Sequence, residues 1–114
     1  MASRFVSSGV EFPNSLGPET LYKAPDFTNP SGAAIVLSCV FANLDGAAPV
    51  DISATILQGG TPVSQPASVV EVPAAASLDI VSNKYVLTSG QELRGLVSAS
   101  GGISVTTSVL EIYG

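Results

Sequence analysis

Hydrophobic and polar residues alternate along much of the chain. Segment 50–56, VDISATI, places an apolar residue at every second position and a polar residue between each pair. Successive side chains of a strand point to opposite faces, so this pattern predicts a strand with Ile52 facing a core and Thr55 facing solvent. The residues predicted to face inward are Val50, Ile52, Ala54 and Ile56.

A continuous apolar run precedes this segment. Residues 33–43, AAIVLSCVFAN, are rich in β-branched side chains and end at the turn sequence NLDG, residues 43–46. Such a run favours a strand covered on both faces, although periodicity alone does not exclude a helix. The turn predicts that segments 33–43 and 50–56 form a hairpin.

The rest of the chain contains shorter segments of the same kind. Residues 57–68 are rich in glycine and proline and predict a loop. Gly95 predicts a bulge, and in the last segment the apolar phase changes between Val105 and Leu110. Segments 77–81 and 84–88 flank the turn residues Ser82 and Asn83. Residues 19–25 predict a short extended piece that Pro25 ends, and the further predicted strands are 69–73, 77–81, 84–88, 91–100 and 103–113.

These segments give about seven short strands separated by tight turns at intervals of roughly 8 to 12 residues. No segment shows a competing helical period. The sequence therefore predicts an all-β protein, an antiparallel β-sandwich of the jelly-roll or immunoglobulin-like type, spanning residues 19–114.

The first 18 residues lack any strict period. Pro13, Gly17 and Pro18 would interrupt a helix, so this segment, residues 1–18, is expected to be an extended N-terminal arm. An extended arm cannot bury large side chains by itself. It either folds back over the sandwich or inserts them into a neighbouring subunit, and the second alternative makes them a protein interface. The candidate interface residues are Phe5, Val10, Phe12 and Leu16.

Composition narrows the possible partners. A chain of 114 residues is long enough for one domain with a real core. Its formal charge of −5 disfavours binding to nucleic acid or to anionic membranes. No apolar run is long enough to span a bilayer, and the N-terminus lacks the apolar core of a signal peptide, so synthesis in the cytoplasm is expected. Only 11% of the residues are charged, so the surface is either coated by Ser and Thr or covered by other subunits.

The sequence offers little catalytic chemistry. It contains no histidine, which excludes triads that activate a serine or cysteine through an imidazole. Cys39 lies within an apolar run, as a buried structural thiol would. The carboxylates, Glu111 among them, are expected on strand exteriors and in turns, and NLDG is read as a type I′ turn or, less simply, as a weak cation loop. No catalytic residue, cofactor or metal site is therefore predicted, and the protein is expected not to be an enzyme.

Several stretches resemble a set of small bacteriophage and prophage proteins. The shared features are ETLYKAP, VEVPAAASLDIV, YVLTSGQELRGLVSAS and the terminal SVLEI, so the resemblance covers residues 19–112. These motifs contain turn and core residues, and the resemblance implies a sandwich fold and association with a virion. It carries no active site to transfer.

The expected function is that of a bacteriophage virion structural protein, most simply a subunit that decorates or cements a capsid through its arm and loops. Its partners would be other virion proteins, with self-association on the particle and neither nucleic acid nor membrane involved. A neck, collar or tail-fibre attachment protein is the alternative. A carbohydrate-binding module is an alternative of another class, against which the absence of tryptophan counts.

Overall fold

The computed structural model describes residues 3–12, 17–27, 31–44, 48–81, 84–99 and 102–113. All regular structure within these ranges is β-strand, which confirms the predicted fold class. The described residues form nine strands, not seven, because the predicted arm contributes β1 and the predicted extended piece 19–25 contributes β2. The strands are β1 (Ser3–Glu11), β2 (Glu19–Lys23), β3 (Ala33–Asn43), β4 (Val50–Gln58), β5 (Thr61–Val72), β6 (Ser77–Asp79), β7 (Tyr85–Leu87), β8 (Glu92–Val97) and β9 (Ile103–Ile112).

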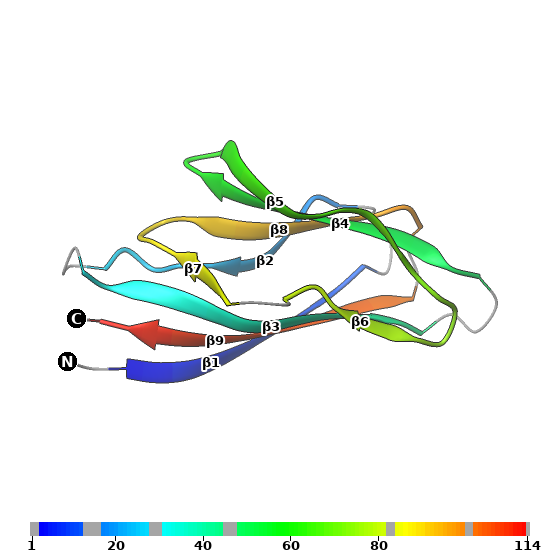
Figure 1. Ribbon diagram of the computed structural model, residues 1–114, viewed down its shortest axis with the longest axis horizontal. Helices are drawn as coiled ribbons and strands as arrows, with labels where there is room; N and C mark the ends of the chain where they lie inside the picture. The colour runs from blue at the N-terminus through cyan, green and yellow to red at the C-terminus, as the bar shows by residue number, and fades with distance from the viewer. Residues whose placement is uncertain are drawn as a thin grey trace.

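The strands form two antiparallel sheets packed face to face (Figure 1). Sheet A has the order β1-β9-β3-β6, with β7 also paired to β3, and sheet B has the order β2-β8-β4-β5. Strands β6 and β7 pair with successive parts of β3 and act as two halves of one edge strand. Counting those halves as one leaves eight strands in two four-stranded layers, which is the jelly-roll arrangement. The topology thus decides between the two predicted sandwich types.

Consecutive strands mostly lie in opposite sheets, which contradicts the predicted hairpin of segments 33–43 and 50–56. Strand β3 belongs to sheet A and β4 to sheet B, so the chain crosses between layers where a hairpin was expected. Segments 77–81 and 84–88 contribute β6 and β7, which both pair with β3 and not with each other. Tight turns were read as hairpins, but the same turn chemistry also serves corners between layers.

Strands β4 and β5 do form a hairpin, at a place predicted to be a loop. Gly59 and Gly60 have φ angles of 59° and 83°, as a type I′ turn requires, and Gln58 pairs with Thr61 across it. Residues 61–68 therefore belong to β5. Its prolines suggested a loop, but β5 lies at the edge of sheet B, where proline is tolerated.

The break between β6 and β7 has a local cause. The Asp79 carboxylate accepts hydrogen bonds from the backbone N–H groups of Cys39 (3.1 Å) and Val81 (2.9 Å). A side chain thus replaces the backbone acceptor that a continuous strand would offer to Cys39. The Tyr85 hydroxyl donates to the Ile80 carbonyl at 2.8 Å and fixes the connecting segment.

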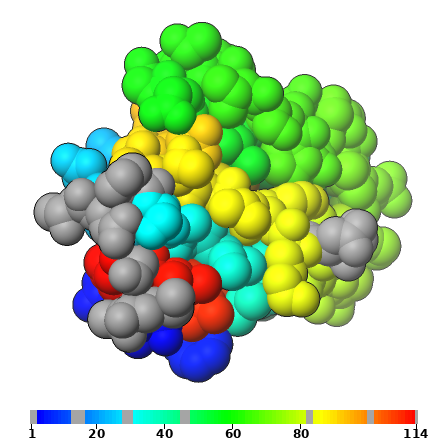
Figure 2. All heavy atoms as spheres, turned by 60° about the vertical axis from the view of Figure 1, so that its left-hand side comes forward, coloured from blue at the N-terminus to red at the C-terminus, as the bar shows by residue number. Residues whose placement is uncertain are grey.

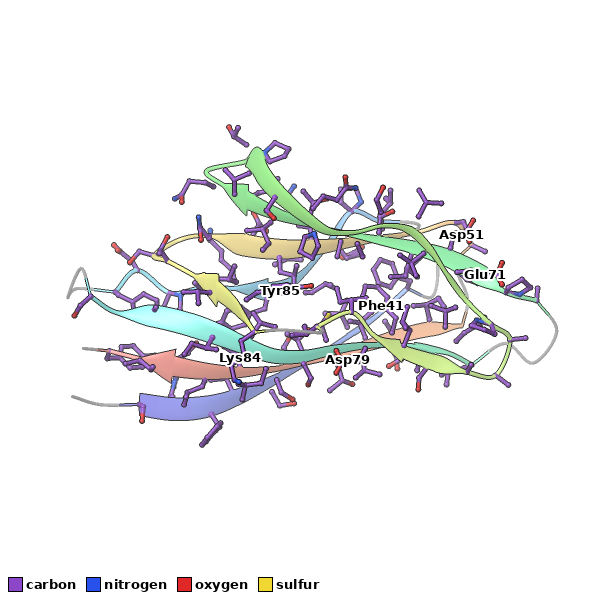
Figure 3. All side chains as sticks on the ribbon, viewed as in Figure 1. Phe41, Asp51, Glu71, Asp79, Lys84 and Tyr85 are labelled. Carbon is purple, nitrogen blue, oxygen red and sulfur yellow. The ribbon has the colours of Figure 1, made fainter. Side chains whose placement is uncertain are left out.

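The core lies between the sheets and draws on every strand except β1 and β6 for its buried apolar side chains. Phe41 is fully buried there and lies between the layers in Figure 3. The inward side predicted for β4 is confirmed, since Ile52 is fully buried while Thr55 is half-buried on the other face. Cys39 is also fully buried, and burial raises the pKa of its thiol to about 11, which makes it a poor nucleophile.

Residues 3–12 are not a free arm. Strand β1 pairs with β9 along its whole length, from Ser3 opposite Ile112 to Glu11 opposite Ser104. Phe12 follows directly and is 1% exposed in the core. The prolines and glycine that suggested an arm all come after the strand. The inward positions of β1 include polar Ser8 as well as apolar Val10. An edge strand has a neighbouring strand on one side only, so it tolerates polar residues at inward positions.

The predicted bulge at Gly95 lies instead on the neighbouring strand. The ladder between β4 and β8 passes through Gly95 without a shift, whereas β2 shifts register between Thr20 and Tyr22. Glycine at position 95 has a packing reason, because an added Cβ would lie 3.1 Å from a methyl group of Leu21. Gly95 makes room for that side chain.

The facing of β4 predicts a contrast between two substitutions. Ile52→Asp should lower the free energy of unfolding by about 4 kcal/mol or more, because it buries an unpaired carboxylate. Thr55→Asp lies on the outer face opposite Arg94 and should cost less than about 0.5 kcal/mol. Urea unfolding of both variants measures the difference, and equal losses would contradict the assigned facing.

The placement of β1 predicts a second contrast. Phe12→Ala should lower the free energy of unfolding by about 3 to 5 kcal/mol, as expected for a phenylalanine removed from a core. Phe5→Ala, on the exposed face of the same segment, should change it by less than about 1 kcal/mol. Thermal unfolding of the two variants provides the measurement. If Phe12→Ala were harmless, residues 3–12 would not be part of the folded domain.

Candidate interaction surfaces

A row of large apolar side chains crosses the outer face of sheet A. Phe5 of β1 lies opposite Leu110 of β9, Leu110 lies opposite Ile35 of β3, and Ile35 lies opposite Val86 of β7. Residues directly opposite each other in a ladder point to the same face, so these four side chains form one continuous row across four strands. We call it the apolar row. Its two ends are the most open, with Phe5 78% and Val86 59% exposed.

The ladder positions that flank the apolar row on β1, β9 and β3 carry no formal charge, and exposed Lys84 lies beside the Val86 end of the row. The ladder position on one side contains Ser3, Ile112 and Ala33, and the position on the other side contains Ser7 and Ser108. In Figure 2 blue β1, red β9 and cyan β3 lie next to one another on the surface. A face with protruding apolar groups and few charges costs little to desolvate, which suits contact with another protein.

The four predicted interface residues differ in where the structure places them. Phe5 is the most exposed large apolar residue of the described chain. Val10 is half-buried and packs against the core, and Phe12 is fully inside it. Leu16 lies outside the described residues. Sequence reasoning found Phe5 but missed Val86, Ile35 and Leu110, since only the pairing of distant strands brings these residues together.

Sheet B has a different outer surface. A shallow groove of about 320 Å³ lies over β4, β5 and β8. Apolar Leu57, Pro62 and Leu96 line it together with polar Gln65 and Arg94. At the far end of this sheet Asp51 and Glu71 lie opposite each other, as Figure 3 shows. Two like charges in such a position oppose each other, and nothing in the groove resembles a reactive centre.

A buried carboxylate anchors the edge of the sandwich where both described ends of the chain meet. Glu111 of β9 is 3% exposed. It accepts hydrogen bonds from Arg4 of β1 at 2.7 Å, from the hydroxyl of Tyr22 of β2 and from the hydroxyl of Tyr113. Tyr113 also packs edge-on against Phe27, with ring centroids 5.3 Å apart. This cluster ties both sheets together.

Glu111 was predicted to lie on a strand exterior, and the structure contradicts that. The inward face of β9 contains Val105, Thr107, Val109 and Glu111 without any change of phase. Two of these inward residues, Thr107 and Glu111, are polar, and this is why the sequence predicted a change of apolar phase between Val105 and Leu110. Thr107 donates to the Cys39 sulfur at 3.6 Å, so both polar residues have partners inside the sandwich.

Hydrogen bonds keep Glu111 ionised. Burial alone would raise its pKa, but the bonds from Tyr113, Tyr22 and Arg4, with the positive charge of Arg4, lower the pKa below the ordinary glutamate value. Burial and the same carboxylate raise the pKa of Tyr22. The cluster is therefore a structural ion pair and does not present a group poised for proton transfer near neutral pH.

Other chemistry is sparse within the described part of the chain. There, no group of three or more His, Cys, Asp or Glu side chains is placed to hold a metal ion. No helix suited to crossing a membrane occurs among the same residues. The candidate cation loop at residues 43–46 lies partly outside the described residues, since Asp45 and Gly46 are not described.

The fold has counterparts in virus particles. No family model and no curated protein matches the sequence. A chain in the acidic stable capsid structure of Helicobacter pylori bacteriophage KHP30 matches with a TM-score of 0.60 and 12% identity, over 100% of this chain and 90% of that one. Chains of the infectious bursal disease virus T13 particle and of its VP2 subviral particle match with TM-scores of 0.57 and 0.52 and identities of 13% and 18%.

The extent of these matches differs. This chain covers 98% of its own length in both bursal disease virus matches but only 31% and 33% of those longer chains. It corresponds to almost the whole of the phage chain. At such identities the likeness concerns the fold alone. A jelly roll of this size forms an entire chain in one case and a part of a larger chain in the others.

The Glu111 cluster predicts a pH-dependent contribution to stability. A carboxylate whose pKa is lower in the folded state stabilises the fold fully above its unfolded pKa of about 4.3, and this contribution is lost as the pH falls through the lowered value. Glu111→Gln should therefore reduce the free energy of unfolding by about 2 to 3 kcal/mol at pH 7.

The difference between the wild type and this variant should shrink below pH 4, as Glu111 of the wild type takes up a proton and becomes neutral like the glutamine. Thermal unfolding across pH 2.5 to 7 tests the pattern. Glu71→Gln is the matched control, since Glu71 is exposed and its removal relieves the repulsion with Asp51, so little loss is expected. A difference between wild type and Glu111→Gln that is independent of pH would contradict the assigned role of the ionised carboxylate.

Proposed function

We propose that this protein is a virion structural protein that decorates or cements a phage capsid, docking through the apolar row on sheet A. The observation that carries the proposal is the concentration of Phe5 and Val86, both widely exposed, in one uncharged row on a rigid jelly roll. An isolated exposed side chain needs no explanation, but a row of four across four strands is characteristic of a contact surface.

Two further observations support this role. The phage chain that this chain matches over 90% of its length comes from a capsid structure. The resemblance of residues 19–112 to small phage proteins points the same way. The described surface offers no catalytic constellation, and the low charge fits a surface that other subunits partly cover.

The contact differs from the one expected from the sequence. A flexible arm would lose conformational entropy on docking, whereas the apolar row lies on paired strands and is already ordered. Binding through a preformed face lets each buried side chain contribute its transfer free energy, roughly 1.5 to 3 kcal/mol for a Phe or Val, without the cost of ordering a flexible backbone segment. Each of the many identical sites on a capsid shell would then bind one copy of the protein through the same preformed face.

The proposal predicts that Phe5→Ser and Val86→Ser each weaken attachment to capsids about tenfold to a hundredfold. Both variants should keep the wild-type melting temperature within about 3 °C, because neither side chain is buried in the core. Capsids that lack the protein are mixed with purified variants, sedimented, and the bound copies counted by gel densitometry.

Leu96→Ser is the matched control, because Leu96 is also an exposed apolar residue but lies on the outer face of sheet B. Normal binding by Leu96→Ser together with loss in the other two variants supports the proposal. The reverse result would move the contact to the groove on sheet B. The number of bound copies distinguishes decoration, with hundreds per particle, from the alternative of a neck or collar protein with about a dozen.

A further inference from the structure

The free edge of β1 is built differently from the other sheet edges. Exposed edge strands can pair with other chains, and proteins usually block them with prolines, bulges, lysines or short strands. Strand β5 has Pro62 and Pro66 and three register shifts, and β2 is five residues long with a bulge and a lysine. Strands β6 and β7 are three residues each. Strand β1 has no proline, bulge or lysine over its nine residues, and its charged side chains, Arg4 and Glu11, lie near its two ends.

The hydrogen-bond pattern shows which groups point outward at this edge. The Phe12 N–H donates to the Ile103 carbonyl at 3.0 Å, so even-numbered residues of β1 bond to β9. The bond from Leu44 to the Gly102 carbonyl at 2.7 Å agrees, because it assigns the even-numbered residues of β9 to β3. The odd-numbered residues of β1 therefore direct their N–H and C=O groups away from the sheet. These residues are Ser3, Phe5, Ser7, Gly9 and Glu11.

Gly9 has no explanation within a single subunit. It lies inside a strand, where glycine is unfavourable, and it lacks the positive φ angle that would require glycine. A Cβ added to it would meet no atom within 4 Å, so packing does not require it either. Glycine in a strand often marks a place where another group approaches the backbone closely.

We propose that β1 pairs with β1 of a second copy of this chain, antiparallel and centred on Ser7. In this register Ser7 lies opposite Ser7 of the other copy, and each Phe5 lies opposite the other copy's Gly9. An aromatic ring packing over a cross-strand glycine on a sheet edge is a favourable pair, and symmetry forms it twice. Ser3 lies opposite Glu11, so no like charges face each other. Shifting the centre by one residue sets Phe5 against Ser7 or Glu11 and loses both pairs.

The pairing has a consequence for docking. A two-fold axis through Ser7 runs perpendicular to the sheet, so the outer faces of both A sheets look in the same direction. A dimer would present two copies of the apolar row on one continuous surface, and two linked contacts bind far more tightly than one. The pairing itself does not rest on the proposed function, because it is measured on purified protein without particles.

Cysteine cross-linking tests the register. Opposite residues of a hydrogen-bonded antiparallel pair have Cα atoms about 5.5 Å apart, within the range of a disulfide. Ser7→Cys should therefore form a disulfide dimer under mild oxidation, while native Cys39 is fully buried and does not compete. Ser3→Cys is the control, because its two copies would lie about 27 Å apart in this register.

Proline substitution tests the edge itself. Ser7→Pro removes an N–H that points outward and leaves the ladder to β9 intact, so it should abolish the dimer in sedimentation velocity without lowering the melting temperature. Ser8→Pro removes a donor to β9 and should unfold the edge. A wild-type chain that stays monomeric up to about 1 mM would overturn the inference. So would a trimer, or a dimer that cross-links through Ser3→Cys and survives Ser7→Pro.

Discussion

Hydrogen bonding along both edges of β9 is the constraint on which this structure depends. One edge pairs with β1 and the other with β3, so the sheet exists only when segments from the two ends and the middle of the described chain meet. The buried carboxylate of Glu111 lies at that junction and binds a cation from β1 and a hydroxyl from β2. Desolvation of a charge is costly unless it is paired, so the cluster favours only the arrangement that supplies all its partners.

The sequence predicted local features well and long-range features poorly. The bounds of β3 and the inward side of β4 followed from apolar runs and alternation, since each reflects one strand and its own burial. Which strands pair did not follow. The turns after β3 and β7 have ordinary hairpin chemistry, yet they carry the chain from one layer to the other. Turn residues define a local bend, whereas the choice of layer depends on the packing of the whole core.

The candidate surface illustrates the same limit. Phe5 could be singled out because a large aromatic residue near a chain end lacks an obvious core position. Val86, Ile35 and Leu110 could not, because each looks like an ordinary strand residue until the ladders align them with Phe5. Phe12 was misassigned for a different reason, since it continues the inward positions Ser8 and Val10 of an edge strand that the sequence pattern did not reveal. The burial of Glu111 was missed because its partners Arg4 and Tyr22 are distant in sequence, and hydrophobic periodicity does not reveal which distant residues meet.

The ladder that joins Ser3 to Ile112 also bears on how the molecule is made. Most contacts within the two sheets link residues far apart in sequence. Such topologies fold over milliseconds to seconds, more slowly than locally connected ones. During synthesis the early strands would wait without β9, leaving the edges of β1 and β3 open. Folding is therefore delayed until β9 has left the ribosome, and the subunit acquires its contact face in one late step. The open edges of β1 and β3 are exposed to other chains during that interval, and the low hydrophobic content of β1 reduces the association that they would favour.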